Sequence, residues 1–195
     1  MPGTTIGTQM NIGYPGTFSR NGDCIIEQKP VTSADASGPN FGNAVVLVQS
    51  ATGGTWTDAA VAEAASHTPV MTQGANYCFA GVAVREVKTM TTYNVQPTAS
   101  AVLGGYSPGQ LCDVLVRGSV VVEIQNPQTT TIVAGGSVWL RLTSNLGTVI
   151  GAFEPANDAG HMLQLTNCYF TTGVTSTDAN GNLVAEITII TRNVP

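Results

Sequence analysis

The stretch Tyr106–Gln125, which reads YSPGQLCDVLVRGSVVVEIQ, contains the clearest strand pattern in the chain. It holds two apolar-rich runs, Leu111–Val116 and Ser119–Gln125, and only Arg117 and Gly118 lie between them. Glycine adopts the positive φ that a two-residue hairpin turn requires. Val and Ile suit the half-buried surface of a pleated sheet. The stretch therefore predicts a β-hairpin with its turn at Arg117–Gly118.

Other apolar runs also have the alternation or β-branched content of strands. These runs are Asp23–Gln28, Ala44–Gln49, Tyr77–Val87, Thr129–Val133, Ser137–Thr143, Val149–Phe153, Met162–Thr171, Val174–Asp178 and Leu183–Thr191. Alternation in the fifth run places Arg141 on the side opposite the apolar face. Asn180-Gly181 is a strong hairpin turn signal between the last two runs. Trp56–Ser66 is the one helical candidate, because it is rich in Ala and contains Glu.

These patterns predict an all-β, mainly antiparallel fold, since no spacing typical of parallel βαβ units is present. We expect a small β-barrel or sandwich with an extended N-terminal arm and at most one short helix. The chain divides into residues 1–30, an N-terminal arm with the first strand, and residues 31–126, a β-barrel-like core domain. Residues 127–195 form a β-rich C-terminal part, either of the same domain or as a small second subdomain.

The segment Met1–Gly16 is rich in Gly, Thr and Pro and has no helical or strand period. It is either a disordered tail or an arm that orders against a neighbouring molecule. Tyr14, Pro15 and Phe18 are the candidate anchors of such an arm, because aromatic side chains carry much of the energy at buried contacts. The alternative is that these three residues pack within their own chain.

The composition excludes several classes of partner. Only 10% of the residues are charged, against about 25% in a usual chain. The net charge is −5 and no Lys/Arg cluster occurs, which argues against nucleic acid and against an anionic membrane surface. No apolar run reaches the roughly 18 residues of a transmembrane helix. Met1–Gly16 lacks the basic start and apolar core of a secretory signal, so we expect synthesis in a cytoplasm.

Four cysteines, Cys24, Cys78, Cys112 and Cys168, are spread along the chain. The two that lie nearest in sequence, Cys78 and Cys112, are 34 positions apart, and no CxxC pair is present. The usual spacing of a structural zinc site is therefore absent. Cys78 and Cys112 lie inside apolar strand patterns, which favours buried, reduced thiols over disulfides or metal ligands.

Candidate catalytic and metal-binding residues are few. The chain has two histidines, His67 and His161, and Asp158 lies three positions before His161 without a third ligand in view. A solvated loop explains this pair better than a metal or acid–base site. Asp178–Asn182 resembles part of a calcium loop, but its Gly is not at the position that such a loop requires and the final Glu is missing. A hairpin turn explains these residues better. We predict no catalytic residue, cofactor or metal; an enzyme site assembled from distant residues is the alternative.

Three groups of motifs resemble the structural cement (head decoration) proteins of tailed bacteriophages. They are, in order, Tyr14-Pro15-Gly16 with Phe41–Val46; Phe79–Val84; and Tyr106–Gly109 with Cys112–Gly118. The resemblance covers residues 12–125 by motif. Each motif is a turn followed by a strand, and none is catalytic.

The resemblance implies a non-enzymatic virion structural protein on the exterior of the capsid, made in the host cytoplasm. Such a protein binds the outer surface of an assembled capsid and stabilises contacts between major capsid protein subunits, usually as a homotrimer. The major capsid protein is then the expected partner, with Tyr14, Pro15 and Phe18 as partner-binding residues. The alternative is another virion β-module, such as a tail, fibre or host-surface glycan-binding protein.

Overall fold

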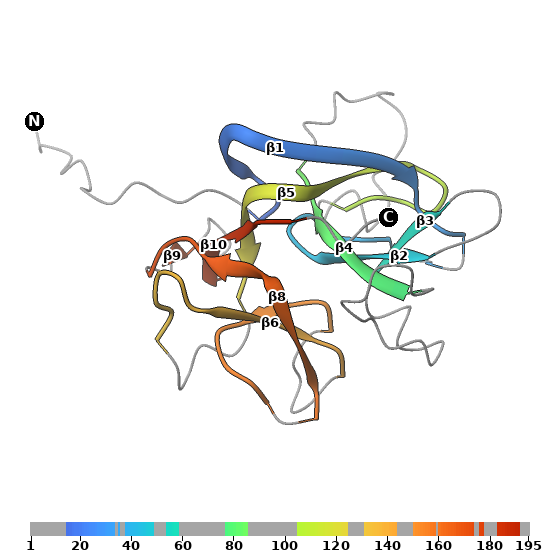
Figure 1. Ribbon diagram of the computed structural model, residues 1–195. Coiled ribbons are helices and arrows are strands. Elements are labelled where there is room, and N and C mark those ends of the chain that lie inside the picture. The colour runs from blue at the N-terminus through green and yellow to red at the C-terminus, as the bar shows by residue number, and fades with distance from the viewer. Residues whose placement is uncertain are drawn as a thin grey trace, which may run out of the picture.

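The computed structural model describes residues 15–33, 35, 38–48, 54–58, 77–85, 105–124, 131–143, 150–158, 160–173, 176–177 and 183–191. Within these ranges the chain forms ten strands and no helix (Figure 1). No helix of the described part is long and apolar enough to cross a membrane. All pairs of named strands are antiparallel, so the predicted all-β, mainly antiparallel class is confirmed.

The strands form one strongly bent sheet. They are β1 (Phe18–Pro30), β2 (Ala44–Val48), β3 (Thr55–Asp58), β4 (Tyr77–Ala83), β5 (Leu111–Glu123), β6 (Ser137–Arg141), β7 (Phe153–Glu154), β8 (Met162–Phe170), β9 (Ser176–Thr177) and β10 (Leu183–Ile189). The order across the sheet is β3-β2-β4-β5-β10-β8-β6-β7, with β1 paired to β5 and β9 paired to β10. Most predicted strands are therefore present, close to their expected positions.

The predicted hairpin at Arg117–Gly118 is wrong, because β5 runs through both residues as one 13-residue strand. β1 pairs along one edge of β5, and β4 and β10 follow one another along the other edge. Gly118 has a φ of 122°, and a Cβ there would lie 2.8 Å from the Sγ of Cys24. The glycine thus permits the close approach of β1 at a bend of β5, and it does not make a turn.

Two further predictions fail for similar reasons. The helix expected from Trp56 does not begin there, because Trp56 lies in β3, pairs with Leu47 and is fully buried. Thr57 and Asp58 continue the same strand, and residues 59–66 of the expected helix lie outside the described ranges. Thr131–Val133, the described part of the run expected at Thr129–Val133, is not a strand. The turn expected at Asn180-Gly181 lies outside the described residues, although β9 and β10 pair on either side of it.

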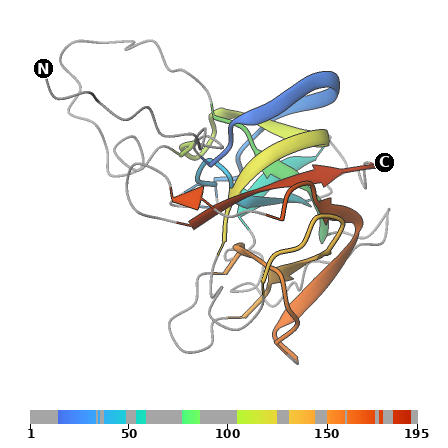
Figure 2. The same cartoon turned by 90° about the vertical axis from the view of Figure 1, so that its left-hand side faces the viewer.

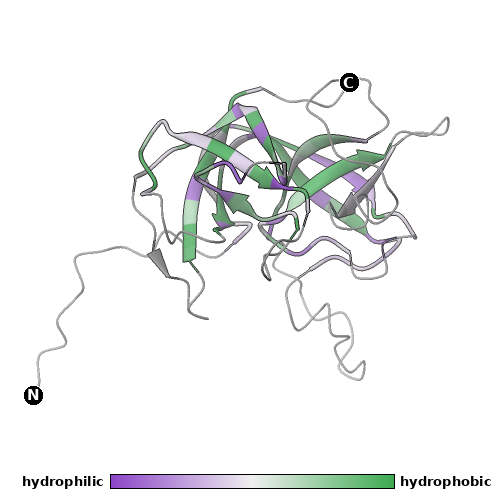
Figure 3. Cartoon of the chain, turned by 90° about the horizontal axis from the view of Figure 1, so that it is seen from below, coloured by the Kyte–Doolittle hydropathy of each residue, from purple (hydrophilic) through white to green (hydrophobic). Residues whose placement is uncertain are grey.

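The apolar side chains form two main cores, one in each half of the molecule. We call the second half of β5 with β10, β8, β6 and β7 the C-terminal ring, since a bridge between Ile124 and Phe153 brings β7 back to the end of β5 (Figure 2). The larger core fills the ring and continues against β4, and it includes Phe79, Leu115, Val120, Leu140, Phe153, Leu165, Phe170 and Ile187. Figure 3 shows that hydrophobic residues are frequent in the strands of the fold, with hydrophilic residues interspersed among them.

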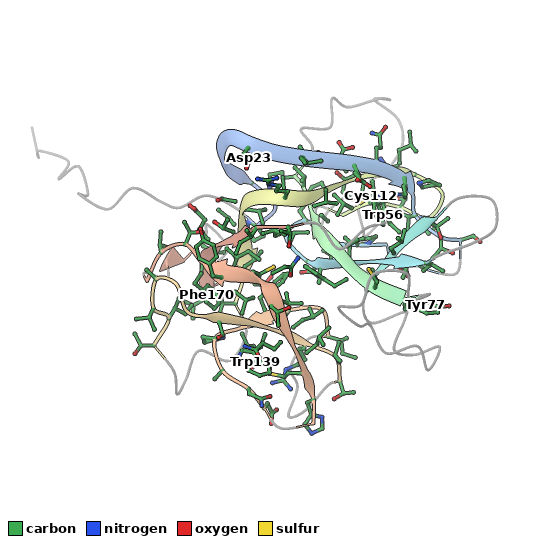
Figure 4. All side chains as sticks on the ribbon, viewed as in Figure 1. Asp23, Trp56, Tyr77, Cys112, Trp139 and Phe170 are labelled. Carbon is green, nitrogen blue, oxygen red and sulfur yellow. The ribbon has the colours of Figure 1, made fainter. Side chains whose placement is uncertain are left out.

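A second core lies between the β2-β3-β4 part of the sheet and the loops around it. It includes Val31, Val45, Leu47, Trp56, Tyr106, Cys112, Val114 and Val116. Trp56 and Cys112 lie in this upper region of the molecule in Figure 4, while Phe170 and Trp139 lie in the ring below. Because β5 contributes to both cores, it joins the two halves. The domain boundaries at residues 30 and 126 stay a prediction.

Candidate functional site

Four of the five large hydrophobic side chains that are exposed in the described residues lie on or beside β1. Ile25 and Ile26 of β1 are 37% and 42% exposed, and Leu111, which pairs with Pro30 at the end of β1, is 53% exposed. Ile190, which follows β10, is 50% exposed and lines a hollow together with Asp23 of β1. We call these four side chains, Ile25, Ile26, Leu111 and Ile190, the β1 face. Single exposed aliphatic residues are ordinary, whereas contiguous exposed apolar patches are typical of interaction surfaces.

The outer edge of β1 is open. β5 occupies one edge of β1, and no strand of the described part of the chain pairs with the other. The pairing is regular from Ile26 to Pro30, whereas the register shifts three times between Phe18 and Ile26. Such irregularities bend an edge strand and limit unspecific pairing. The regular part leaves main-chain groups available to a strand of a partner.

A hollow of about 330 Å³ lies beside the bent part of β1. Its lining consists of Asp23, Arg117, Gly118, Ser119, Tyr169, Thr188, Ile189 and Ile190. At the rim, Nη2 of Arg117 donates a hydrogen bond to Oδ2 of Asp23 at 2.5 Å. Inside, the Thr188 hydroxyl lies 2.7 Å from that of Ser119 and 2.6 Å from that of Thr171. The hollow thus offers hydroxyl groups, an aromatic residue and an exposed ion pair.

The N-terminal segment is attached to the fold at Pro15–Thr17, next to the start of β1. Gly16 donates its N–H to the carbonyl of Val121 at 2.8 Å, and Val121 donates its own to the carbonyl of Thr17 at 2.9 Å. On the other side, the N–H of Arg85 donates to the carbonyl of Gly16 at 2.8 Å. Pro15 and Gly16 are buried. The chain that leads into β1 is therefore fixed between β5 and the end of β4.

The structure describes the three predicted partner-binding residues, Tyr14, Pro15 and Phe18, to different extents. Pro15 is buried in its own chain beside Gly42, where a Cβ would approach the Pro15 Cβ to 2.5 Å. The backbone of Phe18 pairs with Val120, and its side chain is outside the described atoms. Tyr14 lies outside the described residues. Contacts of these residues with a capsid subunit stay a prediction.

The acidic and histidine residues suspected of chemistry take part in structural contacts. Nε and Nη2 of Arg141 donate to the two carboxylate oxygens of Glu154 at 2.6 and 3.0 Å, and Nη1 donates to Asp158 at 3.0 Å. Nδ1 of His161 lies 2.5 Å from the hydroxyl of Thr143. In the described part of the chain no group of three His, Cys, Asp or Glu residues is arranged to hold a metal ion.

Arg141 departs from the sequence expectation, because its side chain is fully buried although it lies opposite the apolar face of β6. The hydrogen bonds that Arg141 donates to the Glu154 carboxylate raise the pKa of Arg141, and desolvation lowers this pKa by less. Two paired hydrogen bonds to one carboxylate are the arrangement that makes a buried guanidinium tolerable. No local sequence pattern predicts this pair, since Glu154 belongs to another strand, β7.

None of the four cysteines forms a disulfide. Cys78, Cys112 and Cys168 are buried, which confirms the expectation for the first two, and Cys24 on β1 is half-buried. Desolvation raises the pKa of the Cys78 and Cys168 thiols above the ordinary value of 9.0. These thiols therefore stay protonated at neutral pH and behave as small apolar side chains.

Comparison with known proteins identifies the family. The model of the family described as "Structural cement protein (E217 gp24/Pam3 gp6)" matches residues 2–190. The chain belongs to the phage structural cement protein family. The cement protein resemblance inferred from motifs is thus confirmed, and it extends well beyond residue 125 into the C-terminal ring. The protein is a capsid-associated cement protein, and its place is in the virion.

The fold of this cement protein also occurs in a solved phage structure. A chain of "The capsid of Myoviridae Phage XM1" is similar with a TM-score of 0.55 and 15% sequence identity. The similarity covers 97% of this chain and 98% of that chain. At this identity the likeness concerns the fold alone. No curated protein matches the sequence.

Proposed function

We propose that this cement protein binds the outer surface of an assembled phage capsid, stabilises contacts between neighbouring major capsid protein subunits, and catalyses no reaction. The family match over residues 2–190 carries this proposal. The β1 face supports it, because Ile25, Ile26, Leu111 and Ile190 leave an apolar surface exposed that a partner can cover.

The stabilising effect follows from mass action. A ligand that binds the assembled shell better than its separate subunits shifts the equilibrium toward the shell. Burial of apolar surface contributes roughly 25 cal/mol per Å², so a few half-exposed isoleucines per copy give only modest affinity. Many copies on one lattice give a large total effect on the shell even when each contact is weak.

We further propose that the segment before Pro15 reaches a neighbouring capsid subunit and binds there as an extended arm. The fixed attachment of Pro15–Thr17 beside β5 supports this, since the segment starts from a defined place on the fold. Tyr14 and Phe18 are the proposed aromatic contacts at the base of the arm. An extended segment can add a strand to a sheet of its partner.

We propose a homotrimer as the binding unit, which the family resemblance supports. Light scattering of the purified protein, alone and after release from shells, measures the mass directly. A mass of three chains in either state supports the trimer, and a single-chain mass in both states contradicts it.

Recognition of a host-surface glycan is a second candidate, and the hollow beside β1 favours it. Tyr169, Arg117 and the hydroxyls of Ser119 and Thr188 are side-chain types that bind sugars. The test is binding of the protein to host polysaccharide, with Tyr169→Ala as the variant that should lose it. Absence of binding by the unaltered protein contradicts this candidate.

The direct test of capsid binding is co-sedimentation with assembled shells and, separately, with free major capsid protein subunits. We expect saturable binding to shells at a fixed ratio of copies per capsid subunit, and much weaker binding to free subunits. Equal binding to both forms contradicts a cement function, because such a ligand does not favour assembly.

A further inference from the structure

Two glycines hold the attachment point of the N-terminal segment so closely that no side chain fits there. Gly16 and Gly42 have φ angles of 80° and 82°, in the region that other residues rarely adopt. A Cβ at Gly42 would lie 2.5 Å from the Cβ of Pro15 and 2.8 Å from the nitrogen of Gly16. A Cβ at Gly16 would lie 2.8 Å from the nitrogen of Arg85. The contact therefore requires glycine on both sides.

Main-chain hydrogen bonds lock the same place. The carbonyl of Ala83, at the end of β4, accepts the N–H of Gly42 at 2.8 Å. The N–H of Arg85 donates to the carbonyl of Gly16 at 2.8 Å, and Gly16 in turn donates to Val121 of β5 at 2.8 Å. The Pro15–Gly16 segment is thus tied to β4 and β5 by main-chain bonds, and Gly42 packs directly against it.

The side chain of Arg85 also contacts the Pro15–Gly16 segment. Its Nε donates to the carbonyl of Pro15 at 3.5 Å, and its guanidinium lies 5.5 Å from the ring centroid of Phe41, a cation–π contact. Phe41 packs edge-on against Tyr106 with ring centroids 5.3 Å apart. The hydroxyl of Tyr106 donates to the carbonyl of Val84 at 2.8 Å. The aromatic pair therefore holds Arg85 over the segment.

We propose that Gly42 and Arg85, with Gly16, form a clasp that positions the N-terminal segment for the capsid. This inference rests on the proposed function, in which residues 1–14 bind a neighbouring capsid subunit. The clasp fixes where the segment leaves the fold, so that the segment and the β1 face engage the shell together. A fixed attachment reduces the freedom lost on binding and raises the effective concentration of the second contact.

The experiment compares Gly42→Ala with Gly135→Ala in the full chain. Both glycines have a positive φ, but a Cβ at Gly135 meets no atom within 4 Å, so this control carries the backbone strain without the clash. We expect Gly42→Ala to bind shells about tenfold more weakly than Gly135→Ala, because the attachment loosens. Arg85→Ala leaves both glycines unchanged. We expect this variant to lose less shell binding than Gly42→Ala. It replaces Gly42→Ala in the comparison if Gly42→Ala does not fold.

Deletion of residues 1–14 separates positioning from simple destabilisation. We expect the deletion to weaken shell binding and Gly42→Ala to cause no further loss in the shortened chain. Equal losses from Gly42→Ala in the full and shortened chains would mean a structural role alone and would overturn the clasp. Shell binding at the wild-type level by both Gly42→Ala and Arg85→Ala would also overturn the clasp. In that case the proposal that residues 1–14 bind the capsid as an arm would still hold if the deletion weakened binding. Normal binding by the shortened chain overturns the arm, and the clasp with it, but leaves capsid binding itself intact.

Discussion

The C-terminal ring and the surface beside β1 each contain an ion pair, but the two pairs differ in their exposure to solvent. In the ring, the side chains of Arg141 and Glu154 form an ion pair with exposed fractions of 0% and 5%. Beside β1, the side chains of Arg117 and Asp23 form an ion pair with exposed fractions of 43% and 69%. The ring also closes on itself through the bridge from Ile124 to Phe153, whereas the outer edge of β1 stays unpaired in the described structure.

The difference in exposure between the two ion pairs indicates that the ring contributes mainly to stability and that the surface beside β1 is available for binding. A buried ion pair becomes costly when one partner is removed, because the other charge is left in an apolar environment. An exposed pair contributes little, because water already solvates both groups. The ring therefore maintains the fold, and the side of the molecule around β1 has charges and apolar groups that a partner can use.

The largest effect is expected from Glu154→Ala. This substitution leaves the buried guanidinium of Arg141 with only Asp158 beside it, which should lower the free energy of unfolding by about 3–5 kcal/mol. The control is Asp23→Ala, which removes the carboxylate of the exposed pair and should cost less than about 1 kcal/mol. Urea unfolding of both variants measures the difference. Similar losses in the two variants would contradict the contrast between the ring and the β1 side.

A smaller effect, on binding rather than folding, is expected from the double variant Ile25→Ser, Ile26→Ser. Loss of the contacts that these two exposed aliphatic side chains make with the shell should weaken shell binding by roughly tenfold to a hundredfold. Because both side chains are exposed in the isolated protein, the unfolding midpoint should change little. Val133→Ser is the matched control, since Val133 is 64% exposed but lies away from β1. Equal binding losses in both variants would mean that the β1 face is not the surface that binds the shell.

The smallest effects are expected at the cysteines. Cys24 on β1 should react with a thiol reagent in the native protein, and the other three cysteines, which are buried, should react only in urea. Burial raises the pKa of Cys78 and Cys168, so the unfolded chain releases these protons at lower pH than the folded chain. Their contribution to stability is therefore complete below pH 9.0 and decreases above it. Urea midpoints at pH 8 and about pH 10 measure this decrease. Faster reaction of Cys168 than of Cys24 in the native protein would contradict the difference in burial between these two thiols.

Local patterns predicted the strands well wherever one face of a strand is buried. The alternation in Ser137–Thr143 and the β-branched run Leu183–Thr191 correspond to β6 and β10. The hairpin prediction failed at Gly118 because the requirement for glycine there comes from Cys24, which is far away in sequence. The same kind of glycine can serve a turn or a close approach, and only the fold decides between them.

The candidate site was harder to predict from sequence. The motifs around Pro15 and Gly42 pointed to the family, but their contact with each other is a tertiary feature. The exposure of Ile25 and Ile26 had no sequence signal, since isoleucine in a strand is usually a core residue. The pairing of Arg141 with Glu154 likewise depends on β6 and β7 lying side by side.

We propose that this cement protein stabilises assembled shells through the β1 face. The most direct measurement is the rupture temperature of shells, followed by light scattering, with no cement protein, with the unaltered protein and with the Ile25→Ser, Ile26→Ser variant. We predict a higher rupture temperature with the unaltered protein and little increase with the variant. Rupture at one temperature in all three samples contradicts the claim.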